Sequence, residues 1–196
     1  MHHIHKTKSF TLSSYPFGES GRILKLLTKD FGLIRVQAHG IRKVTSKLRQ
    51  SIQDHSLSKI ALVYGKTGWR MTNAKILEDY YHKFDQRTIK VISKIFSLLE
   101  RMIPNEEKNS KIFEIVTELH KFIEKSQKKD KITEKKFNLL EIAALLKILH
   151  ELGYVGEEKS IQTIINLDFD EFIKKIKGKD KEMIKIINIG IKESHL

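Results

Sequence analysis

A change of hydrophobic period near residues 79–86 is the feature that most constrains the fold of this chain. Before it, short segments with alternating apolar and polar residues are separated by turn residues, a pattern typical of strands. After it, apolar residues recur at spacings of three and four, which is typical of amphipathic helices. The sequence therefore predicts an α+β protein with a β domain over residues 1–80 and an α-helical domain over residues 81–196.

Five strand-like segments lie in the first domain. A connection bracketed by Gly65 and Gly68 is typical of a hairpin. Residues 22–28 suit either a helix or a strand by periodicity, but the turn and the strand that follow favour a hairpin. The five segments are residues 8–17, 22–28, 33–38, 57–64 and 69–77. Five short strands with turns between them predict a small closed barrel, and we expect the five-stranded OB-fold, which binds nucleic acids.

The second domain is predicted to be all-helical. Pro104 ends the first helix, Thr133 caps the third, Gly153 follows its last turn, and Asp168 or Asp170 caps the fourth. The predicted helices span residues 86–103, 112–123, 134–152, 169–177 and 180–191. Inward-facing residues on the third and the last helix are predicted to be Phe137, Leu140, Ala144, Leu145, Ile148 and Leu152, and Met183, Ile184 and Ile187.

The composition excludes several classes of protein. The chain has no cysteine, which excludes disulfides and cysteine-ligated zinc or iron–sulfur sites and fits a reducing compartment. It contains no run of 18 apolar residues, and its start lacks the apolar stretch of a signal peptide, so we expect a cytoplasmic protein. Three histidines among the first five residues have no other ligand type beside them, and we expect no metal or other cofactor.

No catalytic constellation is present in the sequence. The Gly-Lys-Thr at residues 65–67 is not a phosphate-binding loop, because Ile60 occupies the position that requires a glycine. The histidines form no zinc-binding pair, and no serine lies in a nucleophile elbow. Asp79 and Asp85 are two carboxylates that a metal-dependent nuclease could use, but two carboxylates do not make a site. We expect a binding protein and not an enzyme.

The positive charge is concentrated in the β domain. Residues 1–80 carry 14 Lys and Arg against 5 Asp and Glu, whereas residues 81–196 carry 23 against 19. The strand from residue 33 leads into a basic segment with no acidic residue between Asp30 and Asp54. The segment is either a solvated loop or a flexible cationic surface for a phosphate backbone. The candidate DNA-binding residues are Arg22, Lys25, Arg35, Arg42, Lys43, Lys47 and Arg49.

Aromatic residues of the same domain are candidates for stacking on bases. They are Phe17, Phe31, Tyr64 and Trp69. Small barrels also need aromatic side chains as core filling, and the sequence leaves both roles open for each residue.

Residues 15–24, YPFGESGRIL, resemble the opening of the RecO family of bacterial recombination mediators. Gly21 stands where the family usually has Asp, and Asp54 where it often has Pro. The resemblance continues, in order and at matching spacing, through TKDFGLIRV at 28–36, GIRK at 40–43 and SKLR at 46–49. It is good over residues 5–80 and weaker beyond, where LHELGY at 149–154 resembles the end of a family helix.

This resemblance implies an N-terminal OB-fold, a C-terminal helical domain and a role in recombinational DNA repair. Members of the family bind single- and double-stranded DNA, anneal complementary strands and help to load RecA without a nucleotide cofactor. The implied partners are RecR and the C-terminal tail of the single-stranded-DNA-binding protein. Many members carry a four-cysteine zinc module, which this cysteine-free chain is expected to lack.

Two other interpretations remain open on the sequence alone. An RNA-binding OB-fold protein would have a similar basic charge and would differ by its contacts with 2′-hydroxyl groups. A protein-binding adaptor would place the basic segment against an acidic protein surface. The helices over 132–152 and 168–194 could form a groove for an acidic peptide, but ordinary bundle packing explains the same residues.

Overall fold

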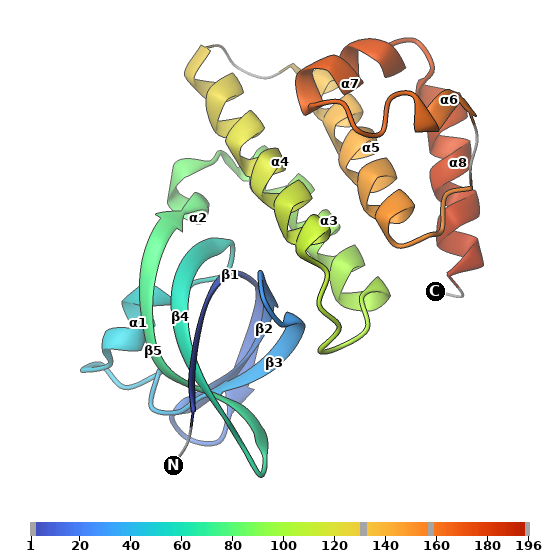
Figure 1. Ribbon diagram of the computed structural model, residues 1–196. Helices are drawn as coiled ribbons and strands as arrows, with labels where there is room; N and C mark the ends of the chain where they lie inside the picture. The colour runs from blue at the N-terminus through green and yellow to red at the C-terminus, as the bar shows by residue number, and fades with distance from the viewer. Residues whose placement is uncertain (1–2, 130–132, 157–158, 195–196) are drawn as a thin grey trace. The chain divides into compact units, whose positions relative to one another are not determined.

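The computed structural model describes residues 3–129, 133–156 and 159–194, and the chain divides into two compact units, residues 1–110 and 111–196. Strands occupy most of the first 80 residues and helices follow, as predicted (Figure 1). No helix within the described ranges is long and apolar enough to cross a membrane.

Five strands close into a barrel in the order β1-β2-β3-β5-β4, which confirms the predicted closed barrel. A short parallel pairing, Val36 with Trp69 and Gln37 with Arg70, joins β3 to β5, and the other neighbours are antiparallel. Residues 22–28 form a strand and not a helix. The strands are β1 (Ile4–Phe17), β2 (Gly21–Thr28), β3 (Gly32–Ala38), β4 (Ser56–Gly65) and β5 (Gly68–Asp79).

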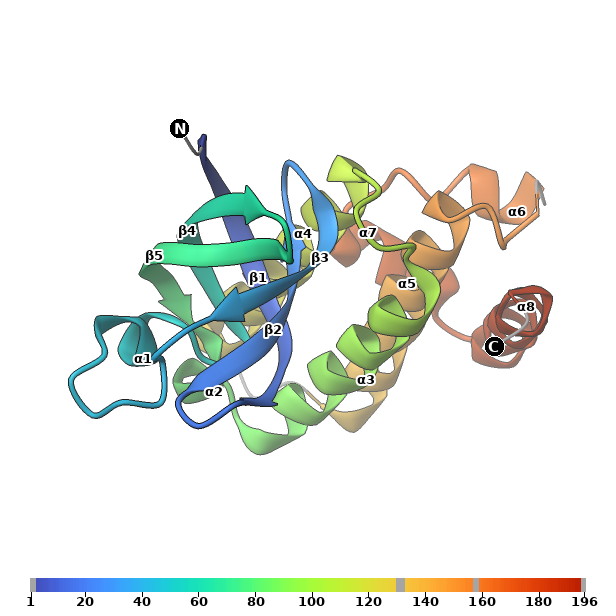
Figure 2. The same cartoon turned by 90° about the horizontal axis from the view of Figure 1, so that it is seen from below.

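The buried cluster inside the barrel is formed by side chains from β2, β3, β4, β5 and the connection between β3 and β4. Seen from below, the strands surround this interior, and the connection that carries α1 (Lys47–Ser51) projects to one side (Figure 2). Ile41 and Ile52, at the two ends of that connection, belong to the same buried cluster as the strand residues. The cluster contains Leu24, Leu26, Ile34, Val36, Ala38, Ile41, Ile52, Ile60, Leu62, Trp69 and Met71.

Helix α3 (Gln86–Met102) belongs to the barrel unit. The ring of Phe96 lies 6.4 Å from that of Phe10 on β1 and stacks on His55 at 5.3 Å. The compact unit therefore ends after Ser110, whereas periodicity alone places the boundary near residue 80. The change of period marks where strands give way to helices, but it does not show which earlier surface a helix packs against.

The segment that follows α3 covers part of β3. Asn105 forms an isolated bridge with Leu33, and the backbone N–H of Glu106 donates to the carbonyl oxygen of Leu33 at 2.8 Å. Gly32 has φ +66°, and a Cβ built on it would lie 1.9 Å from the carbonyl oxygen of Glu107. Position 32 therefore requires a glycine for two reasons: the turn that the sequence predicts and the close approach of the segment after α3.

Most helix termini lie near the predicted positions. The side chain of Thr133 accepts a hydrogen bond from the backbone of Lys136, and Asp168 accepts one from Glu171, so both predicted caps are confirmed. Gly153 has φ +79° after the last turn of α5, as predicted. The remaining helices are α2 (Tyr80–Lys83), α4 (Ser110–Lys129), α5 (Glu134–Glu151), α6 (Lys159–Gln162), α7 (Phe169–Ile176) and α8 (Asp180–Glu193).

Helix α5 is the central helix of the second unit, where it packs against α7 and α8. The predicted one-sided stripe is incomplete, because α5 also buries Leu139, Ile142, Ala143, Leu146, Lys147 and Leu149. A helix with apolar residues on all sides is typical of a central position. On α8, Met183 and Ile187 are buried as predicted, but Ile184 is 44% exposed and its predicted inward position is wrong.

Lowering the pH should destabilise the barrel unit through His55. Burial lowers the pKa of His55 below its usual value of 6.5, and the smaller effect of Asp54 raises it. Below about pH 6.5, His55 of the unfolded chain takes up a proton that His55 of the folded protein does not. The free energy of unfolding therefore decreases as the pH is lowered, until the pH has passed the pKa of His55 in the folded state. The slope contributed by one group is at most about 1.4 kcal/mol per pH unit.

Urea unfolding at several values between pH 7.5 and 5 measures this dependence. The variant His55→Asn should flatten it, because Asn tolerates the positive φ of 63° at this position and does not titrate. The exposed His39 provides the control variant His39→Asn. Equal pH slopes for the wild type and His55→Asn would contradict the assignment.

Candidate nucleic-acid interface

The basic segment after β3 forms turns and the short helix α1, and it is anchored on the barrel at both ends. Gly40 has φ +67° and turns the chain, and the backbone N–H of Arg42 donates to Ser20 in the β1–β2 turn at 2.9 Å. Ile41 and Ile52 are 3% and 4% exposed, so apolar side chains hold both ends against the barrel. The basic residues between these anchors are left facing outward.

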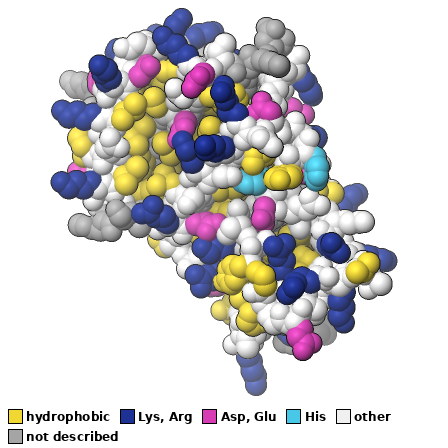
Figure 3. Space-filling view, turned by 180° about the vertical axis from the view of Figure 1, so that it is seen from behind, with side chains coloured by type: hydrophobic (Ala, Val, Ile, Leu, Met, Phe, Trp, Pro, Cys, Tyr) yellow, Lys and Arg dark blue, Asp and Glu magenta, His cyan; other side chains and the backbone are white. Residues whose placement is uncertain are grey.

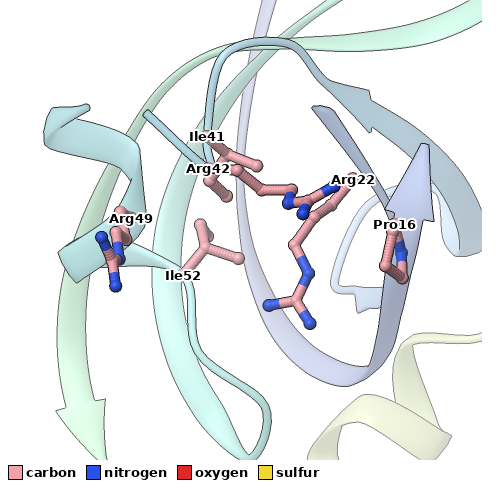
Figure 4. Close-up of a pocket in the computed structure, with 6 residues that line it drawn as sticks. All are labelled: Pro16, Arg22, Ile41, Arg42, Arg49 and Ile52. Atoms are coloured by element: carbon pink, nitrogen blue, oxygen red, sulfur yellow. The ribbon is translucent and has the colours of Figure 1, made fainter. Parts of the chain in front are cut away.

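Three arginines from separate parts of the chain line one cavity of about 260 Å³ (Figure 4). Arg22 comes from the start of β2, Arg42 from the turn after β3, and Arg49 from α1. The other lining residues are Pro16, Ile41 and Ile52. We call this site the arginine pocket; it combines an apolar floor with three cationic side chains.

The charge of the arginine pocket is uncompensated. No acidic residue lines it, and within the described residues none of its three guanidinium groups forms an ion pair or a side-chain hydrogen bond. Guanidinium groups bind phosphate oxygens in a bidentate manner and also stack on planar groups. The pocket therefore has the chemistry to bind a phosphate or a nucleotide.

The other predicted DNA-binding residues do not line the arginine pocket. Lys43 and Lys47 are exposed on the same connection as Arg42 and Arg49 and extend the cationic surface around the pocket. Lys25 and Arg35 face each other across β2 and β3, but Lys25 Nζ lies 2.6 Å from a carboxylate oxygen of Glu100 on α3. This ion pair neutralises Lys25 and makes it the weakest candidate of the predicted set.

Several lysine and arginine side chains lie among hydrophobic and uncharged ones at the lower right of Figure 3, where few acidic side chains are visible. A further cationic group, which was not among the residues predicted from the sequence, lies on β1, β4 and β5 and consists of Lys6, Lys8, Lys59 and Lys75. Two features of the sequence could have indicated this group. No acidic residue lies between Asp54 and Glu78, and the lysines occupy exposed positions in strands whose residues alternate between buried and exposed.

The aromatic candidates divide between core and surface. Trp69 is 8% exposed and belongs to the barrel core, with the ring of Phe31 at 5.0 Å and that of Tyr64 at 4.9 Å. Tyr64 is 53% exposed and Phe17 is 44% exposed. Only these last two present enough ring surface for a base to stack on.

The two carboxylates considered for a nuclease have structural partners. Asp79 accepts a hydrogen bond from the backbone of His82, and Asp85 accepts one from Thr88, so each caps the start of a helix. Among the described residues, no group of three or more His, Asp or Glu is placed to hold a metal ion.

The fold and the site define a small closed β-barrel protein with an uncompensated cationic pocket, followed in sequence by a helical unit. Residues 1–80 match the family model described as Recombination protein O N terminal. This match confirms that the first 80 residues resemble the N-terminal domain of the RecO family.

The similar proteins include three named DNA repair protein RecO. The protein of Acaryochloris marina is 36% identical over 80 residues, which cover 41% of this chain and 27% of that protein. The Thermodesulfovibrio yellowstonii protein is 28% identical over 132 residues, with coverages of 64% and 51%. The Heliobacterium modesticaldum protein is 34% identical over 77 residues, with coverages of 39% and 28%. The matches thus span about half or less of the length of these relatives.

Proposed function

We propose that the protein is a non-enzymatic recombination mediator in DNA repair, which binds single- and double-stranded DNA and anneals complementary strands. The observation that carries the proposal is the uncompensated arginine pocket on a barrel that matches the RecO N-terminal domain. The strand order 1-2-3-5-4 around a closed barrel supports its assignment as an OB-fold. Residues 1–80 are the proposed DNA-binding barrel, α3 belongs to the same compact unit, and residues 111–196 form the separate helical unit.

In the proposed mechanism, cations of the barrel neutralise phosphates and release the condensed counterions. Arg22, Arg42 and Arg49 bind phosphate oxygens directly, while Lys43 and Lys47 add charge around the pocket. Affinity then depends strongly on salt and little on sequence. Screening of the phosphate charges lowers the repulsion between two strands and thereby accelerates annealing.

The partners implied by the family are part of the same proposal. We expect RecR and the tail of the single-stranded-DNA-binding protein to bind this protein and to connect DNA binding to RecA loading. We also expect the protein to be cytoplasmic and associated with the nucleoid. In the helical unit, a cavity of about 280 Å³ includes Phe122, Phe169 and two lysines in its lining. Three acidic residues, Glu118, Asp168 and Asp170, also line it. This cavity on α4 and the start of α7 therefore differs from the lysine-rimmed hydrophobic groove expected between residues 132–152 and 168–194.

An annealing assay across a salt series tests the proposed function. Two complementary fluorescent oligonucleotides are mixed with the wild type, with R42E/K43E/K47E, or with the control K174E/K177E/K185E. The control makes the same charge change at exposed positions of the helical unit. We expect the first triple variant to slow annealing by at least about tenfold and the control to match the wild type, with salt suppressing the wild-type activity.

Other outcomes would favour the alternative functions. Absence of binding by the wild type, even at low salt, would contradict the proposal and favour a protein-binding adaptor. Tighter binding of RNA than of DNA of the same sequence would favour the RNA-binding alternative.

A further inference from the structure

Three lysines stand side by side across three neighbouring strands of the barrel. Lys8 of β1 is in register with Lys59 of β4, which is in register with Lys75 of β5. All three are exposed, whereas Thr7 and Ser58 beside them are buried, so the lysines lie on the outer surface. Figure 1 shows the three strands next to one another. We call this row the lysine ladder; with strands about 4.8 Å apart it spans about 10 Å.

The lysine ladder is unfavourable for the fold by itself, because like charges directly opposite one another destabilise a sheet. β1 and β4 contain no acidic residue, and β5 contains only Glu78 and Asp79 at its end. Those two carboxylates are paired with Lys83 and His82. Within the part of the chain that the structure describes, no ion pair compensates the ladder. Its charge therefore calls for an anion from outside the chain.

The surface beside the ladder is open to an extended ligand. A cavity of about 200 Å³ is lined by Lys6, Lys59 and Lys75 together with Ile60, Ala61, Asn73 and Ala74. In the adjacent row, Lys6 faces Ala61, which faces Asn73. Small residues between lysines leave room for a backbone to lie against the sheet. Because no aromatic residue lines the cavity, contacts with phosphates and not with bases are expected.

We propose that the lysine ladder is a second binding surface for the phosphate backbone of nucleic acid, so that one barrel holds two strands at once. The inference rests on the proposed DNA binding and adds a site to it. A lysine is a flexible point charge, which suits contacts with phosphates that do not depend on sequence. A row of about 10 Å covers about three phosphates at ~3.4 Å each.

The ladder and the arginine pocket are separate sites. They share no residue, and Lys8 and Pro16 are about 26 Å apart along β1 at ~3.3 Å per residue. Two strands held by one barrel have a high effective concentration for each other. The second site thus gives annealing a mechanism that screening by a single site does not provide.

The experiment counts the strands bound per chain. A fluorescent DNA of about ten nucleotides without self-complementarity, within the ~4–16 that one OB-fold covers, is titrated at low salt. We compare the wild type, K8Q/K59Q/K75Q, R22Q/R42Q/R49Q and the control K174Q/K177Q/K185Q. The wild type and the control should bind two strands per chain and each of the other variants one. For a longer DNA that reaches both sites, the slope of log affinity against log salt should decrease in magnitude by about two in the ladder variant.

Each other outcome has a defined meaning. If K8Q/K59Q/K75Q still bound two strands per chain, the proposal of a second site would be overturned. If both triple variants lost all binding, the lysines and arginines would form one continuous site, and the proposed function would stand. A wild type that binds no DNA would instead overturn the proposed function. The variant Lys59→Gln should raise the thermal midpoint at low salt and not at high salt; a lower midpoint would remove the premise that the ladder is repulsive.

Discussion

Reversing the charges of the arginine pocket with R22E/R42E/R49E, in the K8Q/K59Q/K75Q background that removes the second proposed site, is expected to weaken binding of single-stranded DNA by at least about 10³-fold at low salt. A charge-assisted hydrogen bond contributes about 1.5 kcal/mol or more, and three such contacts correspond to this factor. The salt slope should also decrease in magnitude by about two, at ~0.7 per phosphate contact. Fluorescence anisotropy across a salt series measures both quantities on the same oligonucleotide.

A matched variant separates the geometry of the pocket from its charge. R22K/R42K/R49K keeps three cations but loses the bidentate fork, so it should retain the salt slope and lose only part of the affinity. The control K174E/K177E/K185E changes the same number of charges at exposed positions of the helical unit and should bind as the wild type does. If R22E/R42E/R49E in the K8Q/K59Q/K75Q background bound within about threefold of K8Q/K59Q/K75Q alone, the pocket would not be the phosphate site.

The fold of the β domain is predictable because local signals and tertiary packing agree there. Alternating residues and the turn residues between them mark all five strands. Five strands that each bury one apolar face have few ways to pack, and a closed barrel is one of them. The central helix α5 is less predictable, since Leu139 and Leu146 are buried on sides that a single stripe assigns to solvent. Periodicity reports one buried face, whereas a central helix has several.

The site is less predictable than the fold, because it depends on contacts between distant segments. The arginines could be identified from the sequence, but the ion pair of Glu100 with Lys25 and the register that aligns Lys8 with Lys59 could not.

The glycine at position 21, where the family usually has Asp, also has a structural account. A Cβ there would lie 2.7 Å from the carbonyl oxygen of Phe17, so the family's usual Asp would require the end of this hairpin to shift.

Gly32→Ala should destabilise the barrel unit by about 3 kcal/mol or more and lower its thermal midpoint by roughly 10 °C. Alanine at φ +66° costs about 1 kcal/mol or more, and its Cβ would overlap the carbonyl oxygen of Glu107, 1.9 Å away. The segment after α3 must then leave β3, which breaks the hydrogen bond from Glu106 to Leu33, worth about 1 kcal/mol. Urea and thermal unfolding measure the loss of stability.

Gly18→Ala isolates the contribution of the segment after α3. Gly18 also has a positive φ, 59°, but a Cβ on it would meet nothing within 4 Å, so only the conformational cost of about 1 kcal/mol is expected. Hydrogen exchange gives a second measurement, because the amide of Glu106 should lose protection in Gly32→Ala and keep it in Gly18→Ala. Equal destabilisation by the two substitutions would contradict the close packing of residues 105–107 on β3. A larger effect at Gly32 would show that the RecO-type barrel is completed by chain that lies beyond the 80 residues defining it in sequence.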